Sequence, residues 1–277
     1  MSQKTAIRVG AFLSALGAPV LFIVLRWAVS FMGILSYEDA STGNALANEQ
    51  LWTHFVEWGD IALWGIVILL FGTWYRKGLA QKKALPSDKK SWAGQLLCAA
   101  VAGAALWAAL SALLYRAAGE MVTSGLVYRN YGAGSSLFAT PTLWLSAVFL
   151  APLAQELLFR GVQLCSFSKA LGGSAAAFWA ADLLQAAFFA LFAGGLARGV
   201  CAFVFGLFLG WLCRKGDLLP AVAAHMGAAL LTQTPPLAQL QNRAFAGGWA
   251  AFALAAAALT AAALWQMRIA GRRSARS

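Results

Sequence analysis

The chain has 277 residues, of which 61% are hydrophobic and 11% are charged, and its mean hydropathy is +0.69. A soluble globular protein carries about 25% charged residues, so the composition excludes that class. The 21 Lys and Arg residues outnumber the 10 Asp and Glu residues and give a net charge of +11. Most basic residues lie in short segments between apolar runs, where they can contact anionic lipid headgroups. The charge therefore indicates membrane lipids as partners rather than nucleic acid.

Eight long apolar runs predict membrane helices, because backbone polar groups must pair internally in hydrocarbon. The runs cover approximately residues 9–35, 51–75, 92–115, 137–160, 174–193, 197–213, 218–233 and 245–267. The first run is too long for a signal peptide and lacks a clear cleavage site, which favours a retained helix. Gly206 and Gly210 form a G-x-x-x-G pattern that is typical of closely packed helices. The predicted fold is an all-α polytopic membrane bundle of about eight transmembrane helices.

The basic residues also predict the orientation of the chain. With an even number of spans and a cytoplasmic N-terminus, 16 of the 21 Lys and Arg residues fall in cytoplasmic segments and four fall outside. This asymmetry agrees with the positive-inside rule. We therefore expect an integral protein of the bacterial cytoplasmic (inner) membrane with both termini in the cytoplasm.

Ionisable residues in the first two spans call for partners, because a charge in the bilayer is costly. Arg26 and Asp60 each lie about nine residues from the outer ends of their spans, roughly 13 Å deep at the helical rise, and are predicted to form an ion pair. His54, Glu57 and Asp60 are spaced i, i+3, i+6 on the second span. That spacing allows a metal or proton site, but a structural polar cluster near the outer surface is the favoured interpretation.

The segment with the clearest chemistry is Gln155-Glu156-Leu-Leu-Phe-Arg160, at the predicted cytoplasmic end of the fourth span. It places a carboxylate about one turn inside the membrane, and Arg160 can pair with Glu156 at i+4. His225 lies about two turns into the seventh span from the same side, so Glu156 and His225 can share a depth. A Glu and a His that face each other in a buried cavity form a minimal general-base arrangement.

The segment from about 140 to 232 resembles the CAAX-protease and bacteriocin-processing (CPBP, or Abi) family of intramembrane proteases. The family's motifs are E-E-x-x-x-R, then F-x-x-x-H, then a His followed four residues later by Asn or Asp. The resemblance implies a helical membrane architecture. It also implies that the first Glu and the two His, helped by the Asn, would activate a water for peptide-bond hydrolysis.

The first and third motifs are only partly kept. Gln155 stands where the family has its leading Glu, whereas Glu156 and Arg160 match the second Glu and the Arg. Gln is nearly isosteric with Glu but has no carboxylate to take a proton. His225 matches the third motif, but Ala229 stands where the family has Asn or Asp. Gln155 is thus a degenerate catalytic position, and Arg160 is expected to give structural support.

The His of the second motif is missing. Ungapped spacing places Phe188 at this position, and a shifted register places Phe192 or Ala193 there. The chain has two His residues, and His54 lies far upstream near the predicted outer surface. Three of the four water-handling positions are therefore replaced.

Three functions remain open. The favoured hypothesis is a catalytically impaired member of the family that binds a transmembrane or lipidated protein client as a membrane scaffold. The second is an active intramembrane peptidase that uses Glu156 and His225, with Asp182 or Gln185 moved into a supporting role. The third is a transporter or a subunit of a membrane complex. With one His near the site we expect no metal and no other cofactor.

The chain is predicted to divide into three parts. Residues 1–136 form N-terminal membrane helices and loops, residues 137–233 form the protease-like core, and residues 234–277 form a C-terminal membrane helix with a basic tail. The four cysteines lack the spacing of a zinc site and are predicted to be packing residues.

Overall fold

The computed structural model describes residues 2–40, 45–79, 89–118, 141–193, 196–214, 218–234, 248 and 250–267, and the described residues are almost entirely helical. The helices are α1 (Gln3–Ala40), α2 (Ala45–Trp74), η1 (Tyr75–Leu79), α3 (Lys89–Ala118), α5 (Pro141–Leu145), η3 (Ser146–Leu150), α6 (Ala151–Glu156), η4 (Leu157–Leu164), α7 (Cys165–Ala170), α8 (Ala175–Phe192), α9 (Leu196–Arg214) and α10 (Leu218–Gln233). A C-terminal helix covers Ala250–Met267. The segments labelled η are π-helical turns.

Six of the described helical segments are long and apolar enough to cross a membrane: Gln3–Leu35, His54–Lys77, Trp92–Leu114, Ser146–Ala170, Ala175–Phe192 and Ala250–Met267. The predicted spans 197–213 and 218–233 are the helices α9 and α10. With 16 residues, α10 is about 24 Å long at the α-helical rise, shorter than the bilayer core of about 30 Å. The predicted all-α membrane bundle is confirmed.

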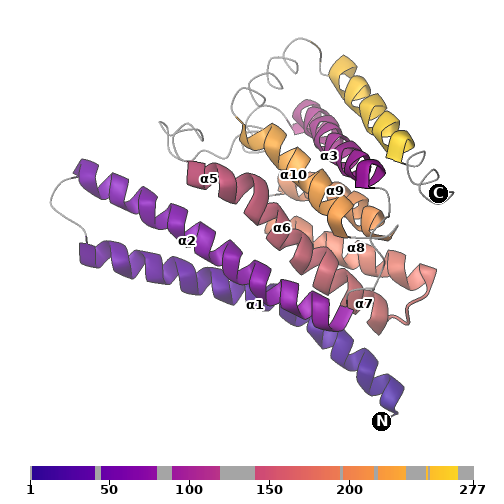
Figure 1. The fold of residues 1–277 in the computed structure, drawn as a ribbon, viewed down its shortest axis with the longest axis horizontal. Coiled ribbons are helices and arrows are strands. Elements are labelled where there is room, and N and C mark those ends of the chain that lie inside the picture. The colour runs from indigo at the N-terminus through magenta and orange to yellow at the C-terminus, as the bar shows by residue number, and fades with distance from the viewer. Residues whose placement is uncertain are drawn as a thin grey trace.

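Figure 1 shows how the helices are arranged. Helices α1 and α2 lie antiparallel along one side, and the rod from α5 to α7 runs beside them. Helix α10 packs between this rod and α3, whereas α8 pairs with α9, and the C-terminal helix lies at the far edge next to α3. The start of α1 and the end of the C-terminal helix lie on the same side of the bundle in Figure 1.

The fourth predicted span differs from the sequence prediction in length. Helix runs from Pro141 to Ala170 through alternating α and π turns, and the junction residues Leu145, Ala151, Leu157 and Cys165 all keep right-handed helical backbone angles. The prediction that this helix ends near residue 160 is wrong. Glu156 is 14 residues from the end of the helix, about 21 Å at the α-helical rise. It therefore lies near the middle of the bundle.

Small residues bring the helices of the core close together. A Cβ at Gly103 of α3 would collide with the carbonyl of Ala224 on α10, and a Cβ at Gly227 of α10 would collide with the carbonyl of Ala100. Glycine is required where backbones approach this closely. The α3–α10 contact is therefore one of the tightest packings in the bundle.

The predicted packing role of the G-x-x-x-G pattern on α9 is also confirmed. A Cβ at Gly206 would lie 3.1 Å from the Cβ of Ala186 on α8, and a Cβ at Gly210 would collide with the carboxylate of Asp182. These two glycines let α9 approach the polar face of α8. The polar groups described next lie at this contact.

Candidate functional site

A buried ion pair lies at the centre of the bundle. Arg160 on η4 donates from Nη1 to Oε1 of Glu156 on α6 over 2.8 Å, and both side chains are fully buried. Nδ1 of His225 on α10 lies 2.7 Å from the same Oε1. The predicted i+4 pair and the predicted approach of His225 to Glu156 are both present. The three residues link the fourth span to α10.

Arg160 also reaches α9 and α8. Its Nη2 donates to the carbonyl of Gly206 over 3.1 Å, and its guanidinium carbon lies 4.4 Å from the ring centroid of Phe189. Oε2 of Glu156 has no hydrogen-bond partner among the described residues. The carboxylate is thus held through one oxygen by a cation and an imidazole.

Asp182 and Gln185 form a second polar pair on α8. Nε2 of Gln185 donates to Oδ1 of Asp182 over 2.7 Å and to the carbonyl of Gly206 over 3.2 Å. The Gly206 carbonyl therefore accepts from both Arg160 and Gln185. Asp182 and Gln185 are fully buried and do not border the cavity described below. They brace the α8–α9 contact and do not take up the supporting role that sequence reasoning considered for them.

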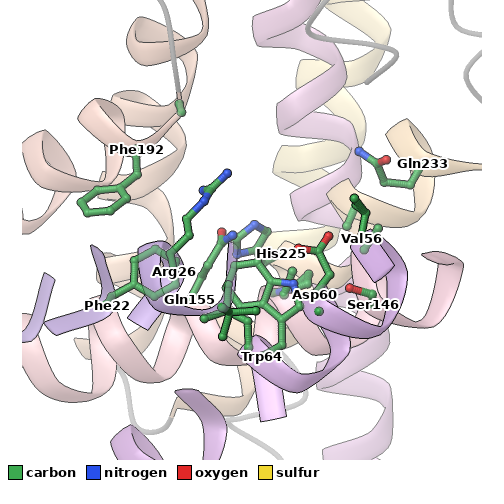
Figure 2. Close-up of a pocket in the computed structure, with 18 of the residues that line it drawn as sticks. Phe22, Arg26, Val56, Asp60, Trp64, Ser146, Gln155, Phe192, His225 and Gln233 are labelled. Carbon is green, nitrogen blue, oxygen red and sulfur yellow. The ribbon is translucent and has the colours of Figure 1, made fainter. Parts of the chain in front are cut away.

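A cavity of about 670 Å³ opens beside this polar centre. Figure 2 shows Arg26, Asp60, Gln155 and His225 around it. Gln155 and Ala229 both border the cavity, and so does His225, whereas Glu156 does not. The cavity wall therefore carries the positions that match the leading Glu, the third-motif His and the Asn of the family. The carboxylate that the chain retains lies behind this wall.

The residues of α8 that border the cavity limit which of them can match the His of the second motif. Phe192 and Ala193 border the cavity, whereas Phe188 packs against Phe167 with a centroid separation of 6.2 Å and does not border it. The ungapped assignment to Phe188 therefore places that position outside the cavity. Sequence reasoning missed Phe189, whose ring meets that of His225 edge-on at 5.7 Å. Phe205 on α9 meets His225 in the same way at 5.8 Å.

The place of Phe189 beside the polar centre could have been predicted from its spacing to Gln185. Phe189 lies four residues after Gln185 on α8, so both share the helix face that points to the polar centre. An apolar ring thus lies across from His225, where it cannot share a water with the imidazole. Phenylalanine offers no lone pair or exchangeable proton for that purpose.

Two polar residues of α2 make separate hydrogen bonds. Nε2 of His54 accepts a hydrogen bond from Nε1 of Trp58 over 3.1 Å, and Oε2 of Glu57 accepts one from Thr142 over 2.9 Å. Within the described ranges, no group of three His, Cys, Asp or Glu side chains converges on a metal position. His54 and Glu57 thus each have a polar partner of their own, and a single structural cluster with Asp60 stays a prediction.

The predicted ion pair between Arg26 and Asp60 is not formed. Both side chains border the cavity, from α1 and α2 respectively. Between pairs of described residues, the ion pairs within 4 Å are those that Glu156 makes. The equal depth of Arg26 and Asp60 gives them a common cavity rather than a direct contact.

The helices and the buried polar centre define a polytopic helical membrane protein. Residues 137–231 match the family model described as Type II CAAX prenyl endopeptidase, Rce1-like. This match covers about a third of the chain and confirms the resemblance for that segment, so the protein is CAAX-protease-like and integral to a membrane. No curated protein and no solved structure was found to match the chain.

Proposed function

We propose that this protein is a catalytically impaired relative of the CAAX proteases that acts as a binding or scaffold protein in the membrane. Its client would be a transmembrane segment or a lipidated protein tail, held in the cavity without hydrolysis. The observation that carries the proposal is the cavity wall, where Gln155, Ala229 and Phe189 or Phe192 stand at or beside the family's water-handling positions.

Each replacement removes a specific step of water activation. The amide of Gln155 cannot accept a proton from water at neutral pH, and Ala229 offers no polar atom. Glu156 retains a carboxylate, but Arg160 holds it as an ion pair and it does not border the cavity. A general base must reach the proton that it removes, directly or through one water. Glu156 does not meet that condition from its present place.

The test is a peptidase and capture assay in proteoliposomes. A set of transmembrane and prenylated peptides is added to the wild-type protein, with a photoreactive residue placed at Phe192 in the cavity or at Leu183 on the exposed face of α8. We expect crosslinks from position 192 that excess unlabelled client abolishes, no such specific crosslink from position 183, and no cleavage product.

A variant that regains the residue types of the family's motifs gives the assay a positive control. The triple substitution Gln155→Glu, Phe189→His and Ala229→Asn returns an acid, an imidazole and an amide to the cavity. Cleavage by this variant, and none by the wild type, would support the proposal. Wild-type turnover that Glu156→Gln abolishes would refute it.

One observation favours a second candidate, an active peptidase. With its proton on Nδ1, His225 donates to Glu156 and keeps Nε2 as a base, as in other carboxylate-oriented imidazoles. His225 is 14% exposed and borders the cavity. This function requires wild-type turnover that is lost in both His225→Gln and Glu156→Gln, in the assay described above.

We further propose that the protein resides in a bacterial cytoplasmic membrane with both termini in the cytoplasm. The distribution of basic residues supports this orientation, and removing the buried Arg160 from the cytoplasmic count leaves the asymmetry strong. Single cysteines in place of Ser2 and Ser277, introduced into a chain without its native cysteines, test the proposal. Neither should react with a membrane-impermeant maleimide in intact spheroplasts, and both should react after lysis.

A further inference from the structure

Two arginines on the cavity wall make no polar contact with another described residue. Arg26 on α1 and Arg198 on α9 both border the cavity, and neither makes a hydrogen bond, ion pair or ring contact with another described residue. Arg26 lies inside a membrane-spanning segment. A cation there is costly and calls for a partner or a function.

The two arginines border the same cavity, and each lies a few residues along the chain from the contact between Phe22 and Phe192. Arg26 follows Phe22 by one helical turn, and the ring of Phe22 packs against that of Phe192, the last residue of α8, with centroids 5.6 Å apart. Arg198 lies in the first turn of α9, directly after the connection from α8. The positive end of a helix dipole is there as well. The cavity wall therefore carries two cations and the first turn of a helix, which are suited to an anion.

The rest of the wall is apolar and aromatic. The rings of Phe22 and Trp64 are stacked 5.7 Å apart, and Phe189 and Phe205 continue this surface inward. Backbone polar groups of an extended segment would be unpaired against these rings, so this wall suits the lipid part of a ligand better than a peptide part. A hydrocarbon chain has no such groups, and about 670 Å³ lies within the usual size range of small-ligand cavities.

From this arrangement we propose that the cavity binds an anionic lipid, with its phosphate between Arg26 and Arg198 and an acyl or prenyl chain along the aromatic wall. This inference goes beyond the proposed protein client and rests only on the proposal that the cavity is a binding site. The exposed side chain of Arg26 gives the headgroup access from the outside of the bundle. Asp60 on the same wall opposes the anion and limits its affinity.

The test measures lipid binding to the purified full chain by native mass spectrometry. The probes are phosphatidic acid and diacylglycerol with identical acyl chains, which differ in the phosphate alone. We expect the phosphatidic acid to bind at least tenfold more tightly. Arg26→Gln and Arg198→Gln should each weaken its binding about tenfold, because a hydrogen bond to a charged group contributes about that factor.

Three further variants separate charge recognition from loss of structure. Arg76→Gln removes an exposed cation outside the cavity and should change binding less than twofold. Arg26→Lys should retain most of the binding that Arg26→Gln loses. Asp60→Asn should strengthen phosphatidic acid binding, whereas a purely structural loss at Asp60 would weaken it.

Several results of these binding measurements would contradict the proposed lipid site. Equal binding of phosphatidic acid and diacylglycerol, or an equal loss in Arg76→Gln, would overturn the inference. Displacement of the lipid by glycerol phosphate alone would assign the site to a soluble anion instead. Arginine-dependent binding of a prenylated peptide carboxylate, without binding of phosphatidic acid, would assign it to a peptide. Peptide cleavage would refute the proposed function but would leave the lipid selectivity measurable.

Discussion

Replacing Arg160 by Leu should destabilise the protein far more than removing a cation from its surface. The change strands the Glu156 carboxylate, which is fully buried and retains a contact with His225. It also removes the donor to the Gly206 carbonyl and the cation above the Phe189 ring. Removing one partner of a buried ion pair costs about 3–5 kcal/mol. We therefore expect a loss of that size in the free energy of unfolding.

The measurement is reversible unfolding in mixed micelles with increasing SDS, followed by tryptophan fluorescence. Arg76→Leu is the matched control, because Arg76 is exposed and a surface change usually shifts stability by less than about 0.5 kcal/mol. Adding Glu156→Gln to Arg160→Leu should recover part of the loss, since it removes the stranded charge. A loss of less than about 1 kcal/mol in Arg160→Leu, or additive effects in the double variant, would refute the reasoning.

Two glycine substitutions test the close helix contacts. Gly210→Ala places a methyl group against the Asp182 carboxylate and should destabilise the α8–α9 contact by about 1–3 kcal/mol, the usual cost of overpacking. Gly227→Ala should have a similar or larger effect, because backbone of α3 occupies the space. Gly17→Ala, which meets nothing within 4 Å, should be neutral or should stabilise by up to about 1 kcal/mol through helix propensity. The same SDS titration measures all three, and equal effects would contradict the packing.

The helices and their contacts were largely predictable because the bilayer restricts the choices. Apolar runs must be helices, and small residues at a spacing of four mark where two helices approach. The pattern at Gly206 and Gly210 led to the correct interpretation for that reason. The tight α3–α10 contact was not predicted, because Gly103 and Gly227 lie singly among many alanines and have no motif of their own.

The end of the fourth span was misjudged because Arg160 was treated as a loop residue. A lone arginine in hydrocarbon is costly, so the sequence favoured a membrane span that ends at this residue. The structure satisfies the guanidinium with Glu156 and with the Gly206 carbonyl, 46 residues away. The first partner follows from i+4 spacing, whereas the second depends on how α9 packs. No local pattern contains that information.

The difference between local spacing and helix packing also explains which site residues could be predicted from the sequence. Glu156 and His225 were predicted as neighbours from a shared depth alone, and they meet at 2.7 Å. Phe189 was missed because the register of α8 about its own axis decides whether residue 188, 189 or 192 faces the cavity. Apolar residues occupy most faces of that helix, so only the polar residues Asp182 and Gln185 indicate which face points to the polar centre.

The division between framework and cavity wall also explains how a chain can keep this fold while residues of its cavity wall change. Glu156 and Arg160 are fully buried and connect the fourth span to α9 and α10, so their loss would strand charges. Gln155 and Ala229 border open space on the cavity side. A substitution there changes the chemistry without requiring neighbouring helices to repack. The positions needed for water activation are therefore more easily replaced than those needed for folding.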